Sequence, residues 1–205
     1  MTAVPKPRTS ETEYLALERA SRERKCEWVN GEMYAMTGAS YPHNVVTANL
    51  AAAVHARLRG KPCRVVSQDL RTRVDQSRLY TYPDVLIVCG SPQFIDGEHD
   101  TLTNPSAIFE VLSPSTESWD RGGKFRHYQR IESLAEYVLL SQTAPQVEVF
   151  RRGQGHWAYE LIEGLDQVLR LSTGGVEIAL ADIYDGVDVN VDVEAAAMPA
   201  PPASS

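Results

Sequence analysis

The sequence Tyr82-Pro83-Asp84-Val85-Leu86-Ile87-Val88-Cys89 is followed by a second apolar run, Ala107-Ile108-Phe109-Glu110-Val111-Leu112. Consecutive apolar residues of this kind are typical of interior strands that are buried on both faces of a sheet. Each run nevertheless carries one carboxylate, Asp84 at its start or Glu110 within it. Burying an unpaired carboxylate costs several kcal/mol. We therefore expect these two acids to meet a cation or to face a cleft.

The chain before these two runs predicts two helices and a hairpin. Ser10 and Glu13 form a capping-box pattern at the start of the first helix. Asn30-Gly31 lies between two apolar-rich stretches and predicts a tight hairpin turn, because both turn positions need positive φ. The second helix begins near Ser40 and ends at Gly60. Its apolar residues recur every four positions, at Val46, Leu50, Val54 and Leu58.

The remaining segments alternate between strands and one more helix. Residues 64–74 alternate between apolar and polar side chains and predict a single half-buried strand, with Gln68 on its inward face. A helix is expected over residues 121–132, and three strands after it, over 137–140, 147–151 and 156–161. This order predicts an α/β fold of the mixed α+β kind, in which helices flank a central mixed β-sheet.

Length and composition are those of one globular domain with loose ends. The chain has 205 residues, of which 43% are hydrophobic and 23% charged. We expect a flexible N-terminal arm over residues 1–8, because Pro5 and Pro7 block regular structure there. We expect a single domain over residues 9–193 and a disordered Pro/Ala-rich tail over residues 194–205.

Cysteine usage, hydropathy and net charge exclude several classes of protein. No apolar run reaches the roughly 18 residues of a membrane-spanning helix, and the N-terminus lacks the apolar core of a secretory signal. Three widely spaced cysteines argue against a disulfide scaffold and fit a cytoplasmic location. The net charge of −7 predicts weak non-specific affinity for nucleic acid, because that affinity comes from cations.

The motifs that are missing narrow the chemistry further. The sequence has no Gly-x-Ser-x-Gly elbow, phosphate loop, Gly-x-Gly-x-x-Gly, His-Glu-x-x-His or Cys-x-x-Cys. Two acids on neighbouring strands could instead share one Mg²⁺, with Mn²⁺ as an alternative, since these ions prefer hard oxygen ligands. Structural roles are the competing interpretation: Asp84 would cap the entry to a strand, and Glu110 would pair with an arginine.

A possible third component lies on the following helix. Asp120, Lys124 and Tyr128 are spaced four apart and share one helical face. Lys124 would orient or deprotonate an attacking water, or hold the scissile phosphate. The competing interpretation is an exposed Asp–Lys pair on a solvated face, and the spacing by itself favours it.

The order of these segments resembles the Uma2 family, described as restriction endonucleases with the PD-(D/E)xK nuclease fold. The resemblance covers roughly residues 10–185 and extends upstream to Glu27 and His43. Its motifs are Tyr82-Pro83-Asp84-Val85, Phe109-Glu110-Val111-Leu112-Ser113-Pro114-Ser115-Thr116, the set Asp120, Lys124 and Tyr128, and Glu136-Tyr137-Val138-Leu139.

This resemblance implies a restriction-endonuclease-like core and Mg²⁺-dependent hydrolysis of phosphodiester bonds in DNA. Asp84 and Glu110 match the two acids of the motif, whereas the lysine expected two residues after the second acid is Leu112. Lys124 matches the position to which the lysine moves in families of this type. The implied catalytic residues are therefore Asp84, Glu110 and Lys124. Glu27 would be a further metal ligand, directly or through water; the competing interpretation is a charge at the end of a strand.

Other polar residues are supporting candidates. Gln68 would bond an active-site water or carboxylate, or satisfy buried backbone. His43, at a helix start, would meet a phosphate, although a surface histidine is the more frequent case. Tyr128 follows Lys124 on its helical face. A cationic rim that phosphates would need could come from five arginines, Arg121, Arg126, Arg130, Arg71 and Arg73.

Three functions remain open on this evidence. The first is a metal-dependent endonuclease that acts on DNA, as a twofold dimer if both strands of a duplex are cut. The second is a catalytically weak or inert module on the nuclease fold that binds nucleic acid or protein, which the net charge of −7 favours. The third is a metal-dependent hydrolase of another phosphoester.

Overall fold

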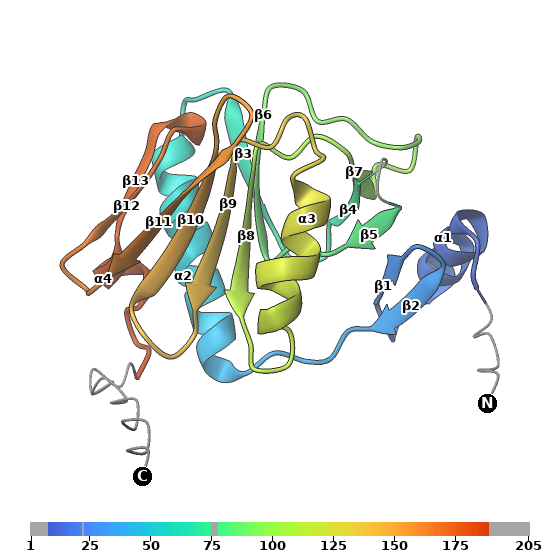
Figure 1. The fold of residues 1–205 in the computed structure, drawn as a ribbon, viewed down its shortest axis with the longest axis horizontal. Helices are drawn as coiled ribbons and strands as arrows, with labels where there is room; N and C mark the ends of the chain where they lie inside the picture. Colours follow the sequence, from blue (N-terminus) through green and yellow to red (C-terminus); the bar gives the residue numbers. More distant parts are fainter. Residues whose placement is uncertain (1–7, 22, 75–77, 189–205) are drawn as a thin grey trace, which may run out of the picture.

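A computed structural model describes residues 8–21, 23–74 and 78–188 of the chain (Figure 1). The predicted tail and all of the predicted arm except Arg8 lie outside these residues. Within the described ranges, no helix combines the length and the apolar character needed to cross a bilayer.

The larger sheet is mixed, as the sequence predicts. Its strand order is β11-β10-β9-β8-β6-β3. β8 and β9 run parallel, whereas every other neighbouring pair is antiparallel. The strands are β3 (Cys63–Ser67), β6 (Val85–Cys89), β8 (Ala107–Leu112), β9 (Glu136–Ser141), β10 (Gln146–Arg152) and β11 (Trp157–Glu163).

A second sheet packs beside the first, with strand order β2-β1-β5-β4-β7. Its strands are β1 (Cys26–Val29), β2 (Glu32–Ala35), β4 (Arg71–Val74), β5 (Leu79–Thr81) and β7 (Thr101–Leu102). β12 (Val168–Leu171) and β13 (Val176–Ala179) form a separate hairpin. The helical segments are α1 (Glu11–Ala20), α2 (Tyr41–Leu58), a π-helical turn (Trp119–Lys124), α3 (Phe125–Tyr128), a 3-10 turn (Thr173–Gly175) and α4 (Leu180–Ile183).

Local signals in the first third of the chain are confirmed. Both halves of the capping box are present at α1, where the Ser10 side chain accepts from the Glu13 N–H. Asn30 and Gly31 have φ of 49° and 101° in the turn between β1 and β2. Ser40 caps α2, which ends shortly before Gly60. Each of these features depends on only a few neighbouring residues.

The prediction of one strand over residues 64–74 is wrong. Gln68 and Asp69 both have positive φ, 56° and 66°, which interrupts the extended backbone between β3 and β4. The two strands consequently belong to different sheets. The side chain of Gln68 is exposed in this turn and does not point inward. Polar residues that fit the alternation of a strand equally fit a surface turn, so the pattern could not separate the two.

Two further expectations are corrected. The helix predicted over residues 121–132 begins earlier, with the π-helical turn at Trp119, and α3 ends at Tyr128. Cys63 and Cys89 form a disulfide, whereas the spacing of the cysteines indicated reduced thiols. Antiparallel pairing places these two residues directly opposite each other on β3 and β6. Sequence spacing carries no information about such pairing.

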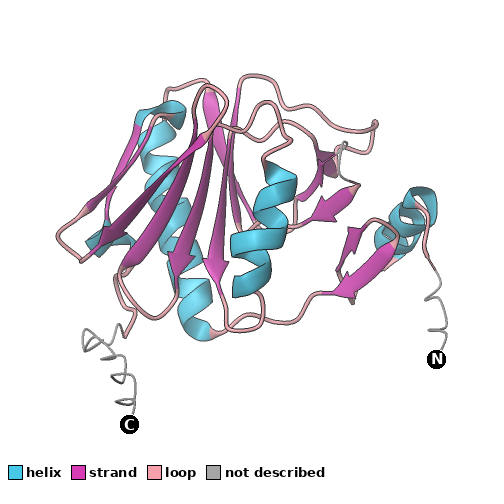
Figure 2. Cartoon of the chain, viewed as in Figure 1, coloured by secondary structure: helices cyan, strands magenta, loops and turns pink. Residues whose placement is uncertain are grey.

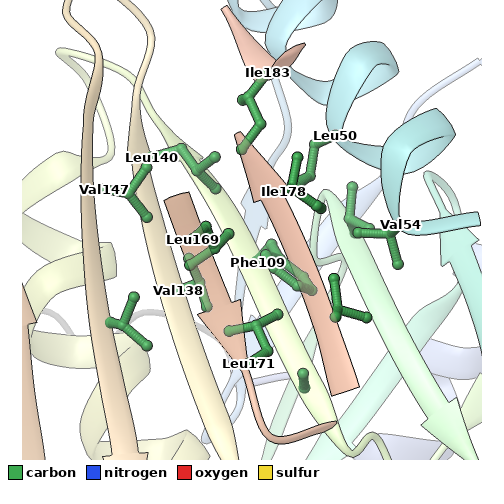
Figure 3. Close-up of a cluster of buried hydrophobic side chains, with 14 of the residues drawn as sticks. Leu50, Val54, Phe109, Val138, Leu140, Val147, Leu169, Leu171, Ile178 and Ile183 are labelled. Carbon is green, nitrogen blue, oxygen red and sulfur yellow. The ribbon is translucent and has the colours of Figure 1, made fainter. Parts of the chain in front are cut away.

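Hydrophobic side chains fill both faces of the larger sheet. Figure 2 shows helices on both sides of its strands. On one face, α2 and the β12–β13 hairpin cover the strands. Figure 3 shows Leu50 and Val54 of α2, together with Leu169 and Ile178, on the same side as Phe109. The opposite face is covered by the segment that contains α3. Its core members include Leu86, Ile108, Leu112, Tyr128 and Leu139.

Candidate active site

Asp84 and Glu110 lie on the face of the larger sheet that α3 covers. Val85 pairs with Phe109 in the antiparallel β6–β8 ladder. Asp84 precedes Val85 and Glu110 follows Phe109, so the two acids lie opposite each other. Strand alternation places Glu110 on the face of Ile108 and Leu112, both of which belong to the core beneath α3. Leu112 therefore occupies the sheet position at which the resemblance implied a lysine.

The Lys124 ammonium lies among three carboxylates. Its Nζ is 3.1 Å from Glu27 Oε1, 3.2 Å from Glu110 Oε1 and 3.1 Å from Asp120 Oδ1. The Lys124 side chain is 8% exposed, and that of Asp120 is 3% exposed. The interpretation of an exposed Asp–Lys pair on a solvated face is therefore wrong. The two residues share a face as their spacing predicts, but that face is buried.

The π-helical turn that carries Asp120 and Lys124 depends on a glycine. A Cβ on Gly123 would lie 1.8 Å from the nearest ring carbon of Trp119, so the indole packs against the bare backbone. A Cβ on Gly122 would meet nothing within 4 Å. The Tyr137 hydroxyl donates to the Asp120 carbonyl at 3.0 Å, which anchors the start of the turn on β9. These contacts hold the Lys124 side chain over the sheet.

Glu27 comes to the site from the second sheet. It lies on β1, and its Oε1 accepts a hydrogen bond from the Thr81 hydroxyl as well as the contact from Lys124. The Glu27 side chain is 13% exposed. Glu27 thus joins the two sheets through the Lys124 ammonium.

Tyr128 fixes the carboxylate of Glu110. Its hydroxyl donates to Glu110 Oε1 at 2.8 Å, and its side chain is fully buried. Burial raises the pKa of Tyr128 well above its ordinary value, and the adjacent Glu110 carboxylate adds to the rise. Tyr128 therefore stays a neutral donor, and its four-residue spacing from Lys124 aims both groups at the same oxygen.

His43 and the backbone hold Asp84. His43 Nε2 lies 3.3 Å from Asp84 Oδ2, and the Val111 N–H donates to the same oxygen at 2.8 Å. Burial lowers the pKa of His43, but the hydrogen bond and charge of Asp84 outweigh it and raise the pKa above 6.5. His43 lies in the first turn of α2, and its side chain is 13% exposed. It is thus part of this cluster and not a surface residue.

The charges of the cluster are strongly interdependent. Burial raises the pKa of Glu110, Lys124 lowers it, and the carboxylates of Asp120, Asp84 and Glu27 raise it again, so that it stays well above 4.5. Burial also raises the pKa of Asp120, despite Lys124. For Lys124 itself burial would lower the pKa, but the surrounding carboxylates raise it well above 10.5. Lys124 is therefore an ammonium at neutral pH.

Some sequence candidates lie elsewhere or are already paired. Gln68 is exposed, and only its backbone N–H reaches the site, donating to the Asp84 carbonyl at 3.1 Å. Arg121 pairs with Glu117 and Glu148. Arg71 is buried against Asp100, and Arg73 lies 3.1 Å from Glu11. These three arginines of the predicted cationic rim therefore already bind carboxylates.

Asp120 is the residue that sequence reasoning undervalued. Its four-residue spacing from Lys124 was the available signal, but spacing on a helix does not tell a buried face from an exposed one. The deciding contacts come from Trp119 and Tyr137, which are packed by the tertiary fold. With Asp120 included, three carboxylates surround the Lys124 ammonium, and Asp84 is a fourth acid, opposite Glu110 on the sheet.

The comparisons with known proteins give the family and the fold. The sequence profile of the Uma2 family, described as "Putative restriction endonuclease", matches residues 12–181. Two relatives come from Synechocystis sp. (strain ATCC 27184 / PCC 6803 / Kazusa). "Uncharacterized protein slr1290" is 36% identical over 90% of this chain and 96% of its own length. "Uncharacterized protein sll1609" is 34% identical over 78% of this chain and 90% of its own length.

A solved structure from Anabaena variabilis ATCC 29413 has the same fold. It is titled as a "putative nuclease belonging to DUF820" and aligns with a TM-score of 0.68 at 15% identity, over 84% of this chain and 96% of its own. This likeness supports the mixed α/β fold with helices flanking the sheet. Taken with the profile match across most of the sequence, it leads to one assignment: the chain belongs to the Uma2 family of restriction-endonuclease-like proteins.

Proposed function

We propose that this protein is a Mg²⁺-dependent endonuclease that hydrolyses phosphodiester bonds of DNA at the cluster formed by Asp84, Glu110 and Lys124. The observation that carries this proposal is the buried ammonium of Lys124, held within 3.2 Å of Glu110 Oε1 on a helix that follows the second acid. The lysine missing from position 112 is thereby supplied from another element. Family membership supports the same class of reaction.

The residues at the site fit a divalent ion. His43 and Val111 both contact Oδ2 of Asp84, and Lys124 and Tyr128 both contact Oε1 of Glu110. Among the described residues, Asp84 Oδ1 and Glu110 Oε2 thus receive no hydrogen bond. Three carboxylates lie within 3.2 Å of the Lys124 ammonium, so this part of the cluster has excess negative charge that a divalent cation would balance. Hard carboxylate oxygens are the ligands that Mg²⁺ and Mn²⁺ prefer.

Two carboxylates, supplemented by water, are a sufficient protein ligand set for Mg²⁺, which usually keeps several of its waters. In the part of the chain that the structure describes, no three His, Cys, Asp or Glu side chains are arranged as a preformed metal site. Glu27 contacts Lys124 instead, and we propose that it acts through that lysine or through a metal-bound water. When bound, the ion would stabilise charge on a phosphate oxygen and make a bound water more acidic.

Lys124 supplies positive charge in this proposal. Because its pKa is raised well above 10.5, it holds its proton throughout the neutral range. We therefore propose that Lys124 orients the water or stabilises the charge on the phosphate. An ammonium in a largely buried site stabilises developing negative charge more strongly than one in water.

Tyr128 and His43 act as positioning residues. Tyr128 donates to Glu110 Oε1, and His43 donates to Asp84 Oδ2. The other oxygen of each acid, Glu110 Oε2 or Asp84 Oδ1, is left free by the described residues. Both free oxygens are thereby held in fixed orientations. The Asp84 side chain is 23% exposed and the Glu110 side chain 5%, so solvent and substrate reach the cluster from the Asp84 side.

The direct test is cleavage of plasmid and short synthetic DNA by the purified full chain. We expect cleavage with Mg²⁺ or Mn²⁺, none with EDTA, and none for Asp84→Ala or Lys124→Met. Glu132→Gln, an exposed substitution in the turn after α3, is the matched control and should cleave like wild type. Metal binding without any cleavage would favour the inert binding module instead, and cleavage by Asp84→Ala would refute the assignment of the site.

Two sequence-based expectations accompany this proposal. A twofold dimer would bring two sites to the two strands of a duplex, and a cytoplasmic location would give access to DNA. Sedimentation of the purified chain with and without a short duplex measures the first. A monomer that nevertheless makes double-strand breaks would contradict it.

A further inference from the structure

We propose that β11 pairs with β11 of a second copy of this chain, so that two larger sheets join edge to edge across a twofold axis. The contact is made by Trp157, Tyr159 and Leu161, which are called the β11 triad below. This pairing would exist whether or not the protein cleaves DNA, because β11 is separated from β8 and its Glu110 by two strands.

β11 is an open edge of the larger sheet. The two edges of that sheet are β11 and β3, and β10 is the one strand that pairs with β11 in the described chain. Four consecutive residues of β11, 158–161, are exposed, although they alternate between the two faces of the sheet. No described segment therefore covers this edge. An uncovered edge offers its N–H and C=O groups to another strand.

The backbone groups of the β11 triad point away from β10. The Gly164 N–H, directly after β11, donates to the Pro145 carbonyl, and alternate residues of an antiparallel strand bond to its neighbour. Counting back from Gly164, the even-numbered residues of β11 bond to β10. The N–H and C=O groups of the odd-numbered residues, which include the whole triad, therefore face outward and are available to a further strand.

The two edges differ in their protection against such pairing. Natural proteins protect edge strands with charged side chains, with proline or by keeping them short. β3 is five residues long, follows Lys61-Pro62 and carries the exposed Arg64. β11 has seven residues without proline, lysine or arginine, and its Glu160 is already paired with Arg151. The usual barriers to strand pairing are thus present at β3 and missing at β11.

The β11 triad also presents apolar surface on one face of the sheet, because its residues are two apart along the strand. Tyr159 is 55% exposed and Leu161 42%, and Trp157 is partly exposed. The ring centroids of Tyr159 and Phe150 lie 5.2 Å apart, so Tyr159 extends the aromatic packing of β10 to the edge. Removing this apolar surface from water would stabilise a pair of strands.

A second copy of β11 matches the triad because the triad is symmetric in character about Tyr159. In a twofold pair the same patch meets itself, and one position of an antiparallel strand faces its own copy. With Tyr159 at that position, the two tyrosines meet, and Trp157 faces Leu161 of the second copy. Aromatic pairs directly across antiparallel strands are favourable, so each apolar side chain gains an apolar partner.

The charged residues favour the same register. Glu160 would face Ala158 of the second copy, and Ala158 is paired on its other side with Arg151. Arg151 and the Glu160 of the second copy would then lie on one sheet face with opposite charges. Moving the twofold axis to Glu160 would set two glutamates directly opposite each other, which is destabilising. Moving it to Leu161 would place Tyr159 opposite Glu163 and lose the apolar pairs.

The experiment is sedimentation equilibrium of the full chain from micromolar to millimolar concentration. We expect a monomer–dimer equilibrium with a dissociation constant of about micromolar size, because one strand forms a small interface. Tyr159→Lys should raise that constant by about tenfold or more, since two lysines would face each other and an aromatic pair is lost. An equimolar mixture of Tyr159→Lys and Tyr159→Glu should associate again, because opposite charges then meet at the axis.

Tyr34→Lys is the matched control. Tyr34 is a similarly exposed tyrosine, 50%, on β2, which is an edge strand of the second sheet. This variant should dimerise like wild type, and circular dichroism checks that all variants are folded. A chain that stays monomeric throughout the concentration range, a dimer that Tyr159→Lys leaves intact, or a mixture that does not associate would overturn the inference.

Hydrogen exchange separates a second copy from a segment of the same chain. The outward N–H groups of the β11 triad should exchange more slowly as the protein concentration rises, because the dimer then forms. Protection of these groups that is the same at all concentrations would place another part of the same chain on the edge and would also overturn the inference.

Discussion

Replacing Lys124 with methionine should destabilise the fold far more than replacing an exposed lysine. Methionine keeps most of the apolar length of the side chain but removes the ammonium that lies between Glu27, Glu110 and Asp120. Those carboxylates would then be buried without a counter-charge. Removing one partner of a buried ion pair costs about 3–5 kcal/mol, so we expect a loss of this size in the free energy of unfolding at neutral pH.

The matched control is Lys25→Met. Lys25 pairs with Asp69 at the surface, where the two side chains are 40% and 73% exposed. Exposed ion pairs contribute about 0–1 kcal/mol, so the same substitution should have little effect there. The contrast between the two variants therefore isolates the burial of Lys124 from the mere loss of a lysine.

The cost of Lys124→Met should shrink as the pH falls. Burial already raises the pKa of Glu110 in the wild type, and Lys124 opposes that rise, so its removal raises the pKa further. Such a carboxyl group has a higher pKa in the folded state than in the unfolded state. Its contribution to stability is fully present below the pKa of the unfolded state and is lost as the pH rises through the pKa of the folded state. The variant should thus recover stability toward pH 4.5, the ordinary glutamate value.

Urea unfolding followed by circular dichroism at several pH values measures all of these quantities. The account also predicts that Mg²⁺ stabilises Lys124→Met, since a divalent ion replaces part of the missing charge and ligands that bind the native state raise its stability. If Lys124→Met lost less than about 1 kcal/mol at neutral pH, or lost no more than Lys25→Met, the reasoning about a buried charge cluster would be refuted.

Two other substitutions test the framework around the site. Gly123→Ala should lower the free energy of unfolding by about 1–3 kcal/mol through overpacking and reduce cleavage, because its Cβ would collide with Trp119. Gly122→Ala has open space around its Cβ and should behave like wild type. Equal unfolding curves for the two variants would contradict this. Hydrogen bonding from Arg19 lowers the pKa of Asp100. Asp100→Asn should therefore be less stable than wild type above about pH 4. The stabilities of the two proteins should converge as the pH falls through the lowered pKa. Urea unfolding midpoints of both proteins, measured from neutral to acid pH, test this prediction. A stability difference that stays constant into strong acid would disprove it.

The sequence predicted the fold well where short-range rules apply. Ser10, Asn30-Gly31 and Ser40 each act through a neighbouring backbone group, and each begins the predicted element. The two apolar runs around Asp84 and Glu110 became adjacent strands for the same reason: their burial is visible in their composition. The mixed sheet then follows from the order of the elements.

Prediction failed where one local pattern fits two structures. Alternating residues 64–74 fit a single strand, but positive φ at Gln68 and Asp69 divides them between two sheets. The four-residue spacing of Asp120 and Lys124 fits an exposed pair or a buried one, and only packing against Trp119 decides it. The Cys63–Cys89 disulfide depends on strand register, which is a long-range property.

The candidate site combines both kinds of information. The sequence indicated Asp84, Glu110 and Lys124 as one group, and the structure brings these side chains together with Glu27, His43 and Tyr128. The direction in which the residues of a strand point could be predicted from alternation. The hydrogen bonds that leave one oxygen of each acid free depend on three-dimensional packing and could not.

The most direct test of the central claim is anomalous X-ray scattering from crystals grown with Mn²⁺. The account predicts a peak between the carboxylates of Asp84 and Glu110, within about 2.2 Å of an oxygen of each, with the Lys124 ammonium beside it. The peak should vanish in Asp84→Ala crystals. A manganese ion bound elsewhere, or no ion while the acids remain arranged as described, would contradict a shared metal site.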